Sequence, residues 1–294
     1  MRTERLRGYG LALIAASLWA TLGLFYRALA AYGLSAITIV FFRALIAAAV
    51  LLVALRWRQP ASLRLTWRDG LFFAAFGLFG VAAFYIVYIY AINLTGMGMA
   101  AVLMYTAPAW VTLLSVPLLG ERLNGVKVAA VALAIGGCAL VGRVYDPTSM
   151  RVNLPGILAG LGAGLTYGLY TLFSKVAQRR HSAWVTLAYG LGLGALFMLP
   201  FQSLPELARA LTTPAILIGL LALGLVPTLA SGVAFNAALR RVPASNVSVV
   251  ASLEPVIASL LGWAFLHERL EGLQILGTGM VLAAVGLLRM NNEQ

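Results

Sequence analysis

Two ionisable side chains, Arg43 and Glu254, stand inside long apolar runs of the sequence. A charge at the centre of a membrane helix costs roughly 2.5–3.5 kcal/mol, so each of them needs an explanation. Glu254 directly precedes Pro255, and its carboxylate could exchange protons or bind an amine, or it could hydrogen-bond polar groups near the proline. Arg43 could bind a carboxylate through two parallel hydrogen bonds, or it could pair with helix ends or extend to the membrane surface. The sequence leaves both pairs of alternatives open.

Aromatic side chains are the second group that could contact a ligand. Trp19, Tyr105 and Tyr167 fall near the middles of apolar segments. A belt at the membrane interface or helix packing explains any single aromatic residue, whereas several together would suit a cavity for an apolar or aromatic ligand. The candidate substrate-binding residues are Trp19, Arg43, Tyr85, Tyr88, Tyr105, Trp110, Tyr167 and Glu254.

The sequence contains none of the patterns that catalytic, metal or cofactor sites require. CxxC, HExxH, GxGxxG and P-loop patterns are absent, and the one cysteine, Cys138, lies in an apolar run. His181 and His267 are far apart in loop-like segments. We therefore expect no metal, no cofactor and no enzymatic activity, and we interpret Cys138 as a small buried residue.

The composition is that of a membrane protein. Hydrophobic residues make up 62% of the chain, charged residues only 10%, and the mean hydropathy is +0.93, whereas about a quarter of a soluble domain is charged. The net charge of +12 would suit nucleic-acid binding. However, the basic residues form short clusters between apolar runs, which is typical of cytoplasmic loops, and we therefore expect no nucleic-acid partner.

Ten apolar segments approach the length of about 20 residues that a membrane helix needs. If the N-terminus is cytoplasmic, 15 of the 21 Lys and Arg residues fall on the inside and 5 on the outside. This bias predicts that both termini are cytoplasmic. The predicted segments are 9–29, 35–55, 70–92, 98–119, 125–142, 155–176, 183–202, 214–238, 246–266 and 272–289.

The chain contains the same unit twice. Residues 108–125 read PAWVTLLSVPLLGERLNG and residues 255–272 read PVIASLLGWAFLHERLEG, an offset of 147 residues. Each half holds five predicted helices, and because five is odd, the second half must enter the membrane from the opposite side. We therefore expect an all-α fold of two inverted repeats, 1–146 and 147–294, with a substrate site near the midplane.

Each repeated unit includes a proline, Pro108 or Pro255, that we expect to kink its helix or act as a hinge. Its second shared feature is a Glu-Arg-Leu triplet, beginning at Glu121 or Glu268. These glutamates could tie helices together at the membrane faces, and helix capping is the simpler interpretation. The halves differ at two candidate positions: Glu254 of the second half is aligned with Ala107 of the first, and Arg43 of the first half is aligned with Gly190 of the second.

The repeated P…(L/F)xxERLxG segment, together with Leu253-Glu254-Pro255 and Arg43, resembles the EamA branch of the drug/metabolite transporter superfamily. The resemblance covers nearly the whole chain. It implies an inner-membrane exporter of small metabolites that works by alternating access between its two halves. Some members export amino acids, including aromatic ones, and others move nucleotide-sugars or phosphorylated sugars. Arg43 is the one basic residue deep in an apolar segment, which disfavours a dianionic substrate.

These observations predict a secondary transporter that exports small metabolites, with amino acids as the expected class. Short loops leave no room for a nucleotide-binding domain, so transport would use a gradient, with Glu254 as the candidate for proton coupling. The expected partners are a small-molecule substrate and the lipid bilayer, for a monomer or weak homodimer. The alternatives are a lipid-handling or scramblase-like membrane protein and a transporter of a different solute such as a nucleotide-sugar.

Overall fold

The computed structural model describes residues 2–146, 153–266 and 270–291. Within these ranges the chain is helical and contains no β-strand. Nine helical stretches of the described chain are long and apolar enough to cross a membrane, and a tenth, Gly125–Val141, is apolar but shorter. The fold is therefore the predicted one, an all-α polytopic membrane protein of two five-helix repeats.

The membrane-spanning stretches are built from one or more helices each. In the first half the elements are α1 (Arg2–Ala20), α2 (Leu22–Ala30), α3 (Ala36–Arg58), α4 (Trp67–Ala75), η2 (Phe76–Ala82), α5 (Ala83–Thr95), α6 (Met97–Met104), α7 (Ala107–Leu119) and α8 (Gly125–Val141). In the second half they are α9 (Leu154–Ala177), α10 (Ala183–Met198), α11 (Leu204–Thr212), α12 (Pro214–Gly224), η5 (Leu225–Ala230), α13 (Ser231–Leu239), α14 (Ala244–Ala251), α15 (Glu254–Leu266) and α16 (Gly272–Asn291).

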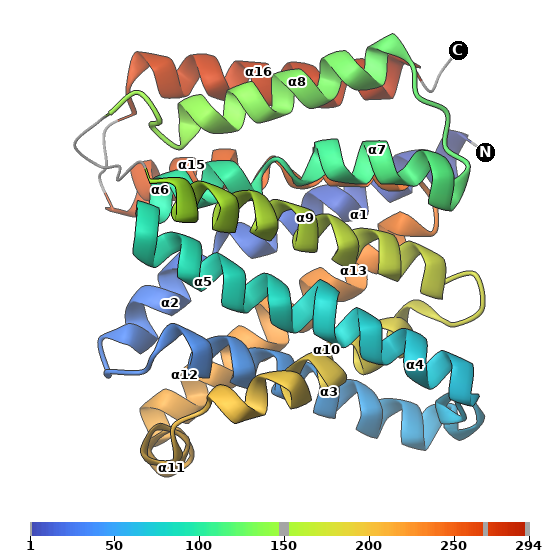
Figure 1. The fold of residues 1–294 in the computed structure, drawn as a ribbon, viewed down its shortest axis with the longest axis vertical. Helices are drawn as coiled ribbons and strands as arrows, with labels where there is room; N and C mark the ends of the chain where they lie inside the picture. Colours follow the sequence, from blue (N-terminus) through green and yellow to red (C-terminus); the bar gives the residue numbers. More distant parts are fainter. Residues whose placement is uncertain (1, 147–152, 267–269, 292–294) are drawn as a thin grey trace.

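The two halves share one register. Five pairs of helices begin 147 residues apart: α3 and α10, α4 and α12, α6 and α14, α7 and α15, and α8 and α16. The halves run in opposite directions through the bundle. Gly8 at the start of α1 and Lys175 at the end of α9 both contact Val242, and Figure 1 shows α1 beginning and α16 ending at the same edge. The repeat is therefore inverted.

The fourth membrane span of each half is interrupted at equivalent positions. The first half breaks at Tyr105 and Thr106, between α6 and α7, and the second half at Ser252 and Leu253, between α14 and α15. Pro108 and Pro255 are each the second residue of the helix that follows. The α-helical pattern is thus interrupted for two residues shortly before each proline, and proline is readily accommodated in the first turn of the helix that follows, where its missing N–H is not needed. A bend or hinge at Pro108 and Pro255 stays a prediction.

The third membrane span of each half contains a π-helical segment. These are η2 (Phe76–Ala82), between α4 and α5, and η5 (Leu225–Ala230), between α12 and α13. A π-helical turn widens the helix by one residue per turn, and such turns are frequent at functional sites. Hydropathy did not reveal these segments, because they are as apolar as the α-helical residues around them.

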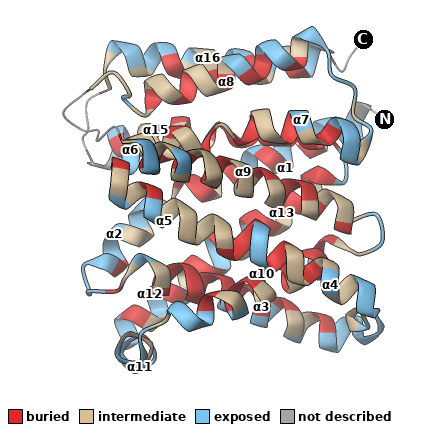
Figure 2. Ribbon diagram, viewed as in Figure 1, coloured by how far each residue is buried: buried red, intermediate tan, exposed pale blue. Residues whose placement is uncertain are grey.

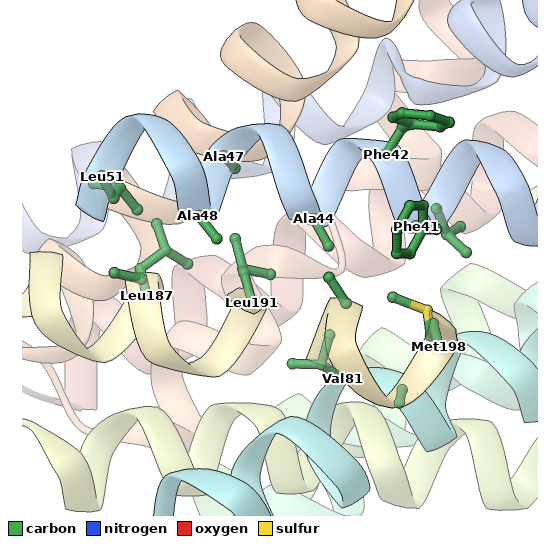
Figure 3. Close-up of a cluster of buried hydrophobic side chains, with 14 of the residues drawn as sticks. Phe41, Phe42, Ala44, Ala47, Ala48, Leu51, Val81, Leu187, Leu191 and Met198 are labelled. Atoms are coloured by element: carbon green, nitrogen blue, oxygen red, sulfur yellow. The ribbon is translucent and has the colours of Figure 1, made fainter. Parts of the chain in front are cut away.

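Small residues let the third span of the first half and the second span of the second half approach closely. A Cβ on Gly77 of η2 would lie 2.7 Å from the Leu193 Cβ, and one on Gly194 of α10 would lie 2.6 Å from the Val81 Cβ. Figure 3 shows Val81 facing Leu191 and Met198 of α10 beneath α3. Buried residues line the interior of the bundle, and exposed ones lie on its outer faces and loops (Figure 2). This core packs against α3, the helix that carries Arg43.

Acidic side chains of one half bind the starts of helices of the other. Oε1 of Glu121 accepts a hydrogen bond from the Ala244 N–H at 2.6 Å, and its Oε2 accepts bonds from the Ser245 hydroxyl and from Lys127 Nζ, the latter at 3.0 Å. At the opposite end, Glu206 Oε2 accepts bonds from the Ser35 N–H at 3.0 Å and its hydroxyl at 2.7 Å. Glu121 thus caps α14, and Glu206 holds Ser35, the residue that caps α3. Glu268, its neighbour Arg269 and His267 lie outside the described residues.

Candidate functional site

Arg43 is in the first half of α3 (Ala36–Arg58) and is 5% exposed. Its Nε donates a hydrogen bond to the Thr228 hydroxyl of η5 at 3.0 Å, and its Nη1 donates to the Tyr26 hydroxyl of α2 at 3.3 Å. Its guanidinium carbon lies 5.4 Å from the centre of the Tyr85 ring, within range of a cation–π interaction. Both halves of the chain therefore hold this buried cation, and it does not extend to the membrane surface.

The guanidinium group has five N–H donors, and these contacts use two of them. In the part of the chain that the structure describes, no acceptor is hydrogen-bonded to Nη2 of Arg43. A buried charge is costly unless it is paired and hydrogen-bonded. The geometry therefore leaves Nη2 and one Nη1 proton able to bind a carboxylate.

Glu254 is the first residue of α15, directly after the break in the ninth membrane span. Its carboxylate lies close enough to the Tyr105 hydroxyl and to Arg43 to interact electrostatically with both. Arg43 and Glu254 are both described, and they do not form a direct ion pair. The amino end of a helix favours a negative charge, so the break in the chain stabilises a carboxylate at the centre of the bundle.

A chain of aromatic contacts links the surroundings of Arg43 to those of Glu254. Trp19 contacts Tyr167 edge-to-face, with ring centres 6.3 Å apart, and Tyr167 stacks on Phe84 at 5.3 Å. Phe84 in turn contacts Tyr85 at 5.0 Å and Tyr88 at 5.8 Å. Tyr88, Tyr105 and Tyr167 also lie within electrostatic range of Glu254. Seven of the eight candidate residues, all but Trp110, therefore form one cluster.

The structure does not bring Trp110 into this cluster. Trp110 is on α7, where its Cβ would lie 3.2 Å from a Cβ added to Gly168 of α9. Two polar side chains near the loop between α13 and α14 also bond to residues of other elements. Asn246 donates to the Tyr9 hydroxyl at 2.8 Å, and the Asn236 amide oxygen accepts from Gln178 at 2.8 Å. These three side chains fix helix packing.

Tyr26, Thr228, Phe84 and Phe235 belong to the site and were missed from the sequence. Phe235 lies 5.0 Å from Trp19, ring centre to ring centre. The available signal was weak: Thr228 follows Pro227 in an otherwise apolar run, and a proline there disturbs an α-helix. Cys138 is buried, as expected, and its thiol donates to the Ser252 carbonyl at 3.7 Å, at the break beside Glu254.

Comparison with known proteins identifies the family. The model of the EamA-like transporter family matches residues 6–143 and again residues 154–290. The chain belongs to the EamA-like transporter family. Its two matches agree with the two structural repeats, and the family is one of transporters rather than enzymes. The protein is therefore a multi-pass membrane transporter whose substrate is a small molecule.

Individual relatives are consistent with this assignment. An uncharacterized transporter of Archaeoglobus fulgidus is 34% identical over 213 residues, 71% of this chain and 74% of the relative. The threonine/homoserine exporter RhtA of Escherichia coli is 30% identical over 200 residues, 68% of this chain and 64% of the relative. A solved crystal structure superposes with a TM-score of 0.79 at 20% identity, covering 98% of this chain and 99% of the other, and supports the fold alone.

Proposed function

We propose that this EamA-like protein exports amino acids across the cytoplasmic membrane by alternating access, with both termini in the cytoplasm. Arg43 binds the substrate carboxylate, Glu254 binds its ammonium group, and the aromatic cluster contacts its side chain. One observation carries the proposal: Arg43 of one half and Glu254 of the other both lie beside one aromatic cluster, and no ion pair joins them directly. A zwitterionic amino acid bound between Arg43 and Glu254 would give each of these side chains an oppositely charged partner.

The geometry of Arg43 supports a carboxylate as the anionic group. Arginine binds planar carboxylates through two parallel bonds, each about 2.7–2.9 Å long, and its terminal nitrogens retain unbonded protons within the described structure. In the described part of the chain, two further cations of the interior are already bonded. Lys127 pairs with Glu121 at 3.0 Å, and Lys175 donates to the Leu239 and Val242 carbonyls. A single available guanidinium favours a monoanionic group over a phosphorylated one.

The position of Glu254 supports binding of the positive end. It follows a helix break, and discontinuous membrane helices are where transporters place substrate and coupling-ion sites. Ala107 occupies the equivalent place in the first half, so the fold does not require the acid. The name of the relative RhtA, a threonine/homoserine exporter, adds independent support for an amino-acid substrate.

The test is export of each of the twenty amino acids from proteoliposomes containing the purified protein. Wild type is expected to export at least one, and Arg43→Gln is expected to abolish that export, because glutamine cannot supply a charged fork. Arg43→Lys should retain only a small fraction, since an ammonium group binds carboxylates as a point charge. Arg56→Gln, at the exposed end of the same helix, is the matched control and should export normally. Export of no amino acid by wild type refutes the proposal.

A further inference from the structure

We propose that Thr228 is a positioning residue that fixes the orientation of the Arg43 guanidinium, so that only its terminal edge can receive the substrate carboxylate. This inference rests on the proposed function and assigns to Thr228 the control of how Arg43 recognises the carboxylate. It starts from the π-helical segment η5 (Leu225–Ala230), to which the predicted site assigned no role.

The Thr228 hydroxyl makes two hydrogen bonds at once. It donates to the Leu223 carbonyl, five residues earlier, at 2.8 Å and accepts from Arg43 Nε at 3.0 Å. A hydroxyl has one proton and two acceptor lone pairs. Its proton is committed to the carbonyl, which leaves a lone pair directed at Arg43. Thr228 is 4% exposed, so the described structure shields this bond from solvent.

The π-helical turn and a glycine together bring Thr228 to Arg43. Pro227 has no N–H to complete an α-helical bond, and the wider turn at η5 accommodates it. Gly224, just before η5, lets α3 approach: a Cβ there would lie 2.7 Å from Ile46 Cγ2 and 3.6 Å from the Arg43 carbonyl oxygen. An ordinary α-helix with a larger residue at 224 would hold the hydroxyl away from α3.

The equivalent position of the first half lacks this hydroxyl. Val81 stands in η2 where Thr228 stands in η5, 147 residues later, and Gly190 stands where the first half has Arg43. Val81 packs against Gly194 instead. Both halves thus form the π-helical turn, but the polar residue is present only in the half that faces the buried arginine. The fold itself does not require a hydroxyl at this position.

Occupation of Nε has a consequence for how a carboxylate binds. A guanidinium can present either its Nε–Nη2 edge or its Nη1–Nη2 edge to the two oxygens of a carboxylate. Thr228 takes the Nε proton, so a bidentate carboxylate must use the terminal edge. Tyr26, at 3.3 Å from Nη1, leaves that nitrogen its second proton. Thr228 therefore fixes the direction from which the substrate carboxylate approaches.

The experiment compares Thr228→Val, which removes only the hydroxyl, with Thr228→Ser, which keeps it. Each is reconstituted in proteoliposomes at equal amounts of folded protein, as measured by size exclusion. The probes are the amino acid that wild type exports fastest in the twenty-compound panel and the carboxamide of the same amino acid. Thr186→Val is the matched control, because the Thr186 hydroxyl is buried on α10 and has no hydrogen-bond partner among the described residues.

Thr228→Val is expected to raise the KM for the amino acid about tenfold with little change in kcat, and to reduce the preference for the amino acid over its carboxamide by a similar factor. Tenfold corresponds to about 1.4 kcal/mol, the magnitude of a hydrogen bond to a charged group. Thr228→Ser and Thr186→Val should stay within about twofold of wild type. A purely structural role would lower transport of both probes together and leave their ratio unchanged.

The result that overturns this inference is an unchanged preference in Thr228→Val, or a Thr228→Ser variant as defective as Thr228→Val. If Arg43→Gln abolishes export in the same experiment, the proposed function stands and only the role of Thr228 is lost. If wild type exports no amino acid, the proposed function fails and the role of Thr228 fails with it.

Discussion

Replacing Glu121 by alanine should weaken the attachment between the two halves. Glu121 lies between α7 and α8, and its carboxylate binds the Ala244 N–H, the Ser245 hydroxyl and Lys127 Nζ. Its side chain is 11% exposed, and that of Lys127 is 10% exposed. The N-cap residue of α14, Pro243, makes no side-chain cap bond of its own. Glu121 therefore supplies a cap that the sequence around α14 does not provide.

The size of the effect follows from these contacts. Loss of a helix N-cap costs about 0.5–2 kcal/mol, and loss of a hydrogen bond to a charged group costs about 1.5–3 kcal/mol. Because the effects overlap at one side chain, we expect the free energy of unfolding to fall by about 3 kcal/mol. For a chain of this length, 1 kcal/mol shifts the Tm by about 2 °C, so Glu121→Ala should melt about 6 °C below wild type.

Thermal unfolding of the purified protein in detergent measures this shift. Glu121→Gln keeps an oxygen that can accept from Ala244 but loses the ion pair with Lys127, so it should melt about 3 °C below wild type. Arg122→Ala, at the exposed neighbouring residue, should melt within about 1 °C of wild type. A Glu121→Ala protein that melts within 1 °C of wild type would refute the reasoning that this carboxylate joins the two halves.

Three further predictions concern charge and aromatic packing. If Glu254 couples export to protons, Glu254→Gln should abolish the pH dependence of export measured in proteoliposomes between pH 6 and 8, whereas unchanged dependence would assign Glu254 to amine binding or local hydrogen bonding. Burial raises the pKa of Glu206, but the Ser35 N–H and hydroxyl outweigh burial and hold that pKa below its usual value. The stabilisation from Glu206 should therefore be complete above about pH 4.3, the pKa of an unfolded glutamate, and should disappear as the pH falls through the lowered pKa of the folded protein. When the Tm is measured from pH 6 to pH 3, it should fall further in wild type than in Glu206→Gln. Parallel curves for the two proteins would contradict this. Trp19→Ala removes the ring that contacts Tyr167 and Phe235, so export of phenylalanine should fall more than export of threonine in a competition assay, and an equal loss for both would argue for a packing role alone.

The limits of the membrane spans could be predicted because hydropathy and capping residues agree there. The predicted segment 125–142 corresponds to Gly125–Val141, where Asn124 caps the helix, and the predicted segment 35–55 corresponds to Ala36–Arg58, where Ser35 caps it. Pro108 and Pro255 pointed to the interruptions of the fourth spans, but the π-helical turns could not be predicted. They change the pattern of backbone hydrogen bonds without changing how apolar the residues are, and a hydropathy profile does not record hydrogen bonding.

The candidate site was predictable residue by residue, but not as an arrangement. A charge in an apolar run is visible in the sequence, so Arg43 and Glu254 could be named. Thr228 bonds to Arg43 across 185 residues of sequence, and no local pattern encodes a contact at that separation. Trp110 was named as a candidate from the sequence, but it packs against α9 instead of joining the cluster. The depth of an aromatic residue in its helix therefore does not say which way its side chain points. The roles of these residues in substrate binding stay predictions.

The contact between Trp19 and Tyr167 has a geometric meaning for transport. The first helices of the two repeats align at an offset of 148 residues, with Gly8 and Phe25 matching Gly156 and Phe173, so Trp19 and Tyr167 are equivalent positions. In an inverted repeat a residue touches its own equivalent only near the pseudo-two-fold axis. A perfectly symmetric site on that axis would accept a ligand in two orientations of equal energy, related by a half turn. Arg43 opposite Gly190, Glu254 opposite Ala107, and Thr228 opposite Val81 remove this degeneracy. The duplicated chain thereby acquires a polarity, and a bound zwitterion would keep the same end toward the same membrane face.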